Sequence, residues 1–105
     1  MANRKSMTRE ERFREIQILH TMLEREQIDH RFLPLMGGFQ ITWPYDKYPP
    51  TISVIEHDLS YGSKEDLLEL QVRGHILPEQ TAQEALEHIR SYAEGEAEQE
   101  ETTQS

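Results

Sequence analysis

Most of the side chains that could perform chemistry lie together in one short segment. Residues 56–62 read EHDLSYG, which places carboxylates, an imidazole and hydroxyl groups close together along the chain. If the segment is a ligand-binding loop at the end of a strand, Tyr61 would stack on the ligand, and Ser60 with the turn amides would bind an anion. If it only connects a strand to a helix, Ser60 caps that helix and Tyr61 covers the core. The residue types leave both interpretations open, and His57, Ser60 and Tyr61 are candidate binding residues.

Catalysis by the same segment is the weaker hypothesis. A small metal-dependent hydrolase or nuclease could use His57 with Glu56 or Asp58, but adjacent residues of an extended chain point to opposite faces. A second imidazole would have to come from His30, and nothing in its spacing from His57 supports a metal site. Ser60 lacks the strand–turn–helix context that activates a nucleophilic serine. We therefore predict no catalytic residue, no metal ligand and no cofactor.

Two tyrosines form a second group of candidates. Tyr45 and Tyr48 lie among the prolines of the segment PYDKYPP. Proline stiffens a loop, and exposed tyrosine is enriched where proteins contact partners. Tyr45 and Tyr48 are therefore candidate partner-binding residues, and the alternative is that they only pack within the loop. A groove that holds Arg31, His57 and Tyr61, closed by a second copy of the chain, would instead indicate a protein that sequesters a small ligand such as a nucleotide.

The charge of the chain argues against nucleic acid as a direct partner. The formal net charge is −9, and the segment 94–105, EGEAEQEETTQS, carries five of the acidic residues. Proteins that bind DNA or RNA displace counterions with basic patches, which this composition does not favour. The same segment has no large apolar side chain to bury, so we expect a disordered acidic tail over 94–105. We expect a flexible N-terminus over 1–7 and a single domain over 8–93.

Location is predicted from two further features of the composition. The chain has no cysteine, which fits a reducing compartment. No apolar stretch is long enough to span a membrane, and no signal peptide is recognised. We expect a cytoplasmic protein with no membrane contact.

Apolar periodicity predicts an α+β domain. Thr8 and Glu11 form a capping box ahead of a helically spaced apolar stripe. Pro34 favours a sheet edge for the first of the strands that follow. The expected elements are a helix over 9–26, strands over 28–35, 39–43 and 51–56 with a hairpin turn at 36–38, a short helix over 64–72, and a closing helix from the Thr81 cap to Gly95. The predicted fold is α-β-β-β-α-α, a small antiparallel three-stranded sheet with an N-terminal helix and two C-terminal helices.

Three short motifs carry a resemblance to known proteins. They are Phe39-Gln40-Ile41 after a glycine turn, Ser60-Tyr61-Gly62 followed by Asp66-Leu67-Leu68-Glu69, and the closing Thr81-Ala82-Gln83-Glu84-Ala85-Leu86. Together they resemble a group of small uncharacterised proteins encoded by phages and prophages of Gram-positive bacteria. The resemblance implies an accessory protein of a virus or mobile element, and it transfers no catalytic residue. Small phage proteins of this kind frequently act by binding.

The leading hypothesis is therefore a non-enzymatic binding protein. Its expected partner is a host protein, which it would block as a counter-defence factor or host-takeover inhibitor, and we expect it to form a homodimer or higher homo-oligomer. The first alternative is an oligomer that sequesters a nucleotide-like ligand, and the second is the small metal-dependent hydrolase. A flat aromatic patch would favour a protein partner. Carboxylates that converge with His57 would favour the enzyme.

Overall fold

The centre of the protein is an antiparallel sheet of five strands, whose order across the sheet is the order along the chain. The computed structural model describes residues 8–60 and 62–104, with 96–104 as backbone only. The strands are β1 (Arg31–Leu35), β2 (Gly38–Trp43), β3 (Ile52–Glu56), β4 (Leu68–Val72) and β5 (His75–Gln80). The helices are α1 (Arg9–Arg12), α2 (Glu15–Arg25), the short 3₁₀ turn η2 (Ser63–Glu65) and α3 (Ala82–Gln104). The segment 1–7, which was expected to be flexible, lies outside the described residues.

The prediction of a three-stranded sheet is wrong, because the segment that was expected to form a short helix is a strand. Leu68, Leu70 and Val72 are 0 %, 0 % and 8 % exposed, and the residues between them face the other side. That period of two is the strand pattern. The helix was expected because Leu67, Leu68 and Val72 also fit a helical spacing. The strand forms because β3 offers an open edge, along which β4 pairs from Leu70 opposite Val54 to Val72 opposite Ile52.

Two tight turns of the same kind set the register of the sheet. Met36 and Gly37 join β1 to β2 with φ of 48° and 83°, and Arg73 and Gly74 join β4 to β5 with φ of 49° and 88°. Positive φ at both central residues is the two-residue turn that fits the twist of a hairpin. The expected hairpin at 36–38 is thereby confirmed. The second hairpin was not predicted, and it supplies β5.

A proline stands at the outer side of each edge strand. In a two-residue hairpin the pair that flanks the turn exchanges backbone hydrogen bonds, and every second pair repeats this. The registers therefore direct the backbone groups of Phe32 and Pro34 outward on β1 and those of Ile76 outward on β5, where Pro78 stands at the irregularity in the β4–β5 register. Proline has no N–H, so each edge lacks a donor where a further strand would pair. The edge position predicted from Pro34 is confirmed by the strand order.

The N-terminal helix is divided into two. Its capping box is confirmed, because the Glu11 amide donates to Thr8 Oγ1 at 3.1 Å and the Thr8 amide donates to Glu11 Oε1 at 2.9 Å. The helix then breaks between Arg12 and Glu15, where a continuous helix over 9–26 was expected. The apolar stripe remains buried across the break, with Phe13, Ile16, Leu19 and Leu23 all 3 % exposed or less.

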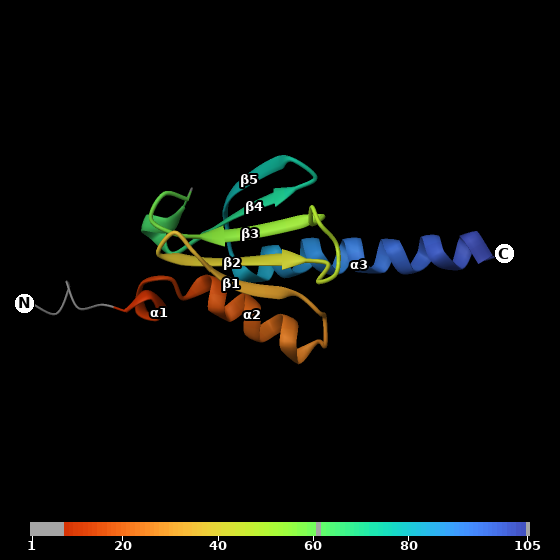
Figure 1. The fold of residues 1–105 in the computed structure, drawn as a ribbon, viewed down its shortest axis with the longest axis horizontal. Helices are drawn as coiled ribbons and strands as arrows, with labels where there is room; N and C mark the ends of the chain where they lie inside the picture. The colour runs from red at the N-terminus through yellow and green to blue at the C-terminus, as the bar shows by residue number, and fades with distance from the viewer. Residues whose placement is uncertain (1–7, 61, 105) are drawn as a thin grey trace, which may run out of the picture.

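The C-terminal helix begins as predicted and ends later than predicted. The Glu84 amide donates to Thr81 Oγ1 at 3.1 Å, and the Thr81 amide donates to Glu84 Oε1 at 2.8 Å, which is the expected capping box. Gly95 does not end the helix, and α3 continues to Gln104, beyond the sheet (Figure 1). Residues 94–104 therefore belong to α3, whereas a disordered tail was expected. The domain boundary at residue 93 stays a prediction.

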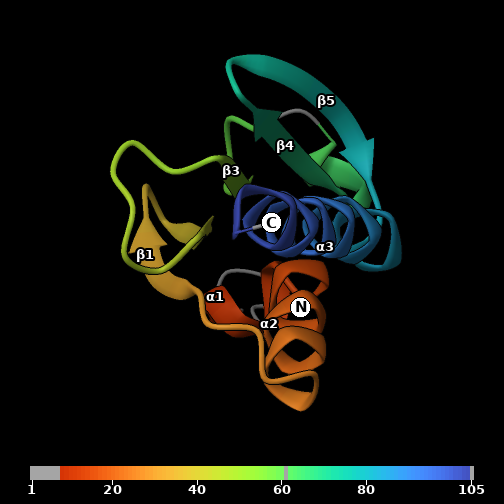
Figure 2. The same cartoon turned by 90° about the vertical axis from the view of Figure 1, so that its right-hand side faces the viewer.

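The helices cover one face of the sheet and leave the other face open. Figure 2 shows α3 end-on inside the curve of the sheet, with α2 beside it. The core between these layers contains Ile41, Trp43, Ile52 and Val54 from the sheet. None of the described helices is long and apolar enough to cross a membrane. The outer face of the sheet is the surface that the described elements do not cover.

We predict that Gly38→Ala destabilises the protein severely. A Cβ at this position would overlap the Glu56 carbonyl oxygen of the neighbouring strand and lie 2.7 Å from His57 Cα, and backbone cannot move aside locally. Gly95→Ala is the control, because a Cβ there meets nothing within 4 Å and alanine favours helix by about 1 kcal/mol. Thermal denaturation should show a large loss for Gly38→Ala and no loss for Gly95→Ala. Similar melting temperatures for Gly38→Ala and wild type would contradict the close approach of β2 and β3.

Candidate functional site

The helix α2 begins without a local cap, and the connection between β3 and β4 supplies one. Arg14 occupies the N-cap position and makes no side-chain capping bond. The Ile16 amide donates to Glu56 Oε1 at 3.1 Å. The Arg14 and Glu15 amides donate to Asp66 Oδ1 at 3.0 and 3.1 Å. Amides at the start of α2 that have no partner within the helix are therefore bound by carboxyls far along the chain.

The same junction holds the start of α3. The Ala82 amide donates to Glu15 Oε2 at 2.6 Å. Both α2 and α3 begin at this end of the sheet (Figure 1), so the positive ends of two helix dipoles meet the carboxyls. We call Glu15, Glu56 and Asp66 the carboxyl cluster. Its contacts are those of a structural junction.

Within this cluster, the Glu56 carboxyl is the group that keeps a proton at neutral pH. Glu56 is 0 % exposed, and its Oε2 has no hydrogen-bond donor among the described residues. Burial raises the pKa of Glu56 to about 9, and the neighbouring Asp66 carboxyl adds to the rise. Burial would also raise the pKa of Asp66, but hydrogen bonds from Glu56 and from the Glu15 and Arg14 amides outweigh it and lower the pKa of Asp66. A protonated Glu56 can donate through Oε2 to the ionised Asp66.

His57 and Ser60 form a closed turn with each other. The His57 amide donates to Ser60 Oγ at 3.0 Å, and Ser60 Oγ donates to the His57 carbonyl oxygen at 2.9 Å. The Leu59 amide donates to His57 Nδ1 at 3.0 Å. His57 and Ser60 are buried, and these contacts fit the interpretation of the segment as a structural connection. Tyr61 lies outside the described residues.

The side chains that a hydrolase would need do not converge. Glu56 turns into the core, His57 binds within its own turn, and Asp58 forms an ion pair with Arg12. Among the described side chains, which cover residues 8–60 and 62–95, no group of three or more histidine, aspartate or glutamate residues is arranged to hold a metal ion. No observation in the described structure therefore favours the hydrolase alternative.

His30 pairs with another histidine, a contact that was not predicted. His20 Nδ1 and His30 Nε2 are 2.7 Å apart, and His30 Nδ1 lies 2.8 Å from the Ile28 carbonyl oxygen. The carbonyl can only accept, so His30 carries a proton on Nδ1. The His20 ring stacks on Phe32 at 4.2 Å between centroids. Burial and the neighbouring His30 lower the pKa of His20, and the Glu24 carboxylate opposes that shift.

Arg31, Tyr45 and Tyr48 lie together at the other end of the sheet. Arg31 Nε donates to the Tyr45 carbonyl oxygen at 2.8 Å, and its guanidinium carbon lies 4.5 Å from the centroid of the Tyr45 ring. Tyr45 is 52 % exposed and Tyr48 is 94 % exposed. Arg31 and the tyrosine loop adjoin the start of β3, whereas His57 follows its end. The six predicted site residues therefore do not form one site.

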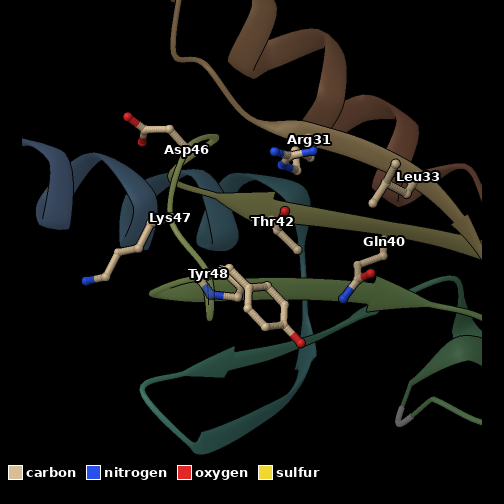
Figure 3. Close-up of a pocket in the computed structure, with 8 residues that line it drawn as sticks. Arg31, Leu33, Gln40, Thr42, Asp46, Lys47 and Tyr48 are labelled. Carbon is tan, nitrogen blue, oxygen red and sulfur yellow. The ribbon is translucent and has the colours of Figure 1, made fainter.

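A hollow opens beside this group on the uncovered face of the sheet. It has a volume of about 430 Å³ and is lined by Arg31, Leu33, Gln40, Thr42, Asp46, Lys47, Tyr48 and Pro50. Figure 3 shows the Arg31, Gln40 and Thr42 side chains over the sheet and the Tyr48 ring across the strands, while Asp46 and Lys47 point away. Sequence reasoning missed Leu33, Gln40 and Thr42. Strand alternation could have found Gln40 and Thr42, since they lie between core residues of β2.

Comparisons with protein-family models, with curated proteins and with solved structures find no match for this chain. The observed architecture is an α+β protein with a five-stranded antiparallel sheet, helices on one face and an open second face. The resemblance to phage proteins and the binding role stay predictions. Support for a function therefore has to come from the geometry of the described residues.

We predict that Glu56→Gln removes a pH dependence of stability. The pKa of Glu56 rises from 4.5 to about 9 in the fold, so folding takes up a proton between these values. In that window the unfolded chain binds fewer protons than the folded one, and the free energy of unfolding falls by up to about 1.4 kcal/mol per pH unit. Glutamine can accept from the Ile16 amide and donate to Asp66 at every pH.

Chemical denaturation of both proteins from about pH 5 to about pH 9 measures this effect. The variant should gain stability relative to wild type as the pH rises. The difference between the two proteins cancels groups common to both, such as His20. Glu56→Ala is the control, because it leaves a cavity and an unbound Ile16 amide and should cost about 2–4 kcal/mol. Parallel stability curves for wild type and Glu56→Gln would contradict a proton on Glu56.

Proposed function

We propose that this protein is a non-enzymatic accessory protein of a phage or mobile element that acts in the host cytoplasm by binding a host protein. The observation that carries the proposal is the uncovered sheet face with an aromatic loop at one end. Antiparallel sheets commonly expose one face to water, but this face and its rim present large apolar side chains. Leu33, Tyr48 and Ile76 are 43 %, 94 % and 51 % exposed. Exposed aromatic side chains such as Tyr48 are enriched where proteins contact partners.

The two edge prolines support a partner that lies across the face. A partner strand that extended the sheet would need donors along an edge. Pro34 and Pro78 remove one at each edge, so edge addition is disfavoured. The open face between the edges carries no such obstacle. The proposed role is inhibition of a host protein by occupation of its surface, as a counter-defence or takeover factor.

Sequestration of a nucleotide-like ligand is less well supported. That alternative required Arg31, His57 and Tyr61 to share a groove. Arg31 lies near the start of β3 and His57 after its end, and a strand of five residues separates them by roughly 15 Å. The hollow is also poorly suited to enclosing a small molecule, because Tyr48 on its rim is 94 % exposed.

We predict that charge or truncation on the open face abolishes partner binding without affecting the fold. Leu33→Asp and Tyr48→Ala should each change stability by no more than about 0.5 kcal/mol, as exposed positions do. Leu59→Asp is the matched control, because Leu59 is 78 % exposed and belongs to the turn after β3. Immobilised wild type and Leu59→Asp should retain one host protein from a lysate, and this partner, once purified, should rebind both. Equal rebinding by Leu33→Asp and Tyr48→Ala would place the interface elsewhere.

We also predict self-association through the open face, which would compete with the host protein for the same surface. The edge prolines disfavour dimers built by strand pairing, so a symmetric dimer would bury the faces against each other. Light scattering should then show a dimer for wild type and for Leu59→Asp, and a monomer for Leu33→Asp. A wild-type monomer at high concentration would rule out this assembly, and it would leave the face free for the host protein.

A further inference from the structure

Arg31 is held in place without a carboxylate partner. Arg12, Arg14 and Arg90 lie within salt-bridge distance of aspartate or glutamate, whereas the other described arginines, Arg9, Arg25 and Arg73, do not. Arg31 has no such partner among the described residues, although the chain has 20 acidic residues against 11 lysines and arginines. Its Nε is bound to the Tyr45 carbonyl oxygen at 2.8 Å, and the guanidinium stacks at 4.5 Å on the Tyr45 ring. The terminal amino groups are thereby oriented and left without an ionic partner.

The groups around Arg31 favour a single anionic side chain. Thr42 offers a hydroxyl at the centre of the hollow, and Gln40 is fixed by its amide nitrogen, which donates to Ser53 Oγ at 3.1 Å. The acidic residue of the lining, Asp46, points away from these groups (Figure 3). A guanidinium fork matches the two oxygens of a carboxylate. Leu33 and the Tyr48 ring supply apolar surface beside that position.

We propose that the hollow binds an aspartate or glutamate side chain of a partner peptide that lies across β1 and β2, with an adjacent aliphatic residue on Leu33 and Tyr48. The inference rests on the proposed function and names the chemistry of its partner. The carboxylate replaces the ion pair that Arg31 lacks within its own chain. The ordering of Arg31 by Tyr45 reduces the entropy lost when the pair forms.

The test begins with random linear peptides displayed on a surface and selected on immobilised wild-type protein. The selected peptides should share an acidic residue next to an aliphatic one. The strongest binder is then synthesised, together with a version in which the acidic residue is replaced by its amide. Fluorescence polarisation measures the dissociation constant of both peptides for wild type and for the variants.

Arg31→Gln should weaken binding of the acidic peptide about tenfold or more. Arg31→Lys should bind this peptide with an affinity between those of wild type and Arg31→Gln, because lysine keeps the charge and loses the fork. The amide peptide should bind wild type more weakly than the acidic peptide does, by a similar factor. The Arg31→Gln substitution should not weaken binding of the amide peptide any further. Arg73→Gln is the matched control, because Arg73 also stacks on a tyrosine, with its guanidinium carbon 5.0 Å from the Tyr92 ring, but lies outside the hollow. It should bind like wild type. Circular dichroism checks that every variant is folded.

Several results would overturn the inference. Selected peptides without an acidic residue would do so, as would additive losses from Arg31→Gln and the amide peptide. The absence of any selected peptide would also overturn it. If neutral peptides bind wild type but do not bind Leu33→Asp, the proposed recognition of a carboxylate is wrong and the proposed binding face is supported. If peptides bind wild type, Arg31→Gln and Leu33→Asp equally, both the inference and the proposed face are wrong.

Discussion

The starts of two helices meet three carboxyl groups at one end of the sheet, and the arrangement of the other elements depends on this junction. Glu56 and Asp66 bind the first amides of α2, and Glu15 of α2 binds the first amide of α3. Helix starts carry unpaired amides that must be bound when they are buried. Carboxyls at the end of β3 and in the connection to β4 bind the first amides of α2, and Glu15 binds the first amide of α3. Both helices are therefore held against the same face of the sheet. The buried proton on Glu56 is the condition under which these carboxyls can lie side by side.

This junction also explains how the protein divides its polar residues between structure and surface. At the end of β3, His57, Ser60 and the carboxyls are occupied by backbone contacts, so the segment richest in reactive side chains serves the fold. At the opposite end, Arg31 is oriented by a ring and a carbonyl and has no ionic partner among the described residues. The edge prolines direct contact away from the strand edges and toward the face between them. The proposed binding surface and the structural junction are thus separated by the length of the sheet.

The sequence by itself determined the features that depend on local patterns. The capping boxes at Thr8 and Thr81 and the hairpin at 36–38 were predicted where they occur. The buried stripe of the first helix and the edge position of Pro34 were also correct. Each of these features depends on residue types that are close together in the sequence. Such patterns can be recognised without knowledge of the tertiary structure. The exposure of Tyr45 and Tyr48 was predicted for the same reason, because aromatics among prolines are a local signal of an exposed loop.

Only the tertiary structure decided the features that depend on distant segments. Residues 68–72 fit both a helix and a strand, and the open edge of β3 selected the strand. The break before α2 needed Asp66, whose carboxylate binds an amide 52 residues away. Glu56 was considered for catalysis because its neighbours are reactive, whereas its burial and its contact with Ile16, 40 residues away, give it a structural role. Arg31 meets Tyr45 because the β1–β2 register aligns Arg31 with Thr42. Burial, dielectric surroundings and hydrogen-bond partners are properties of the packed chain, so no spacing in the sequence could specify them.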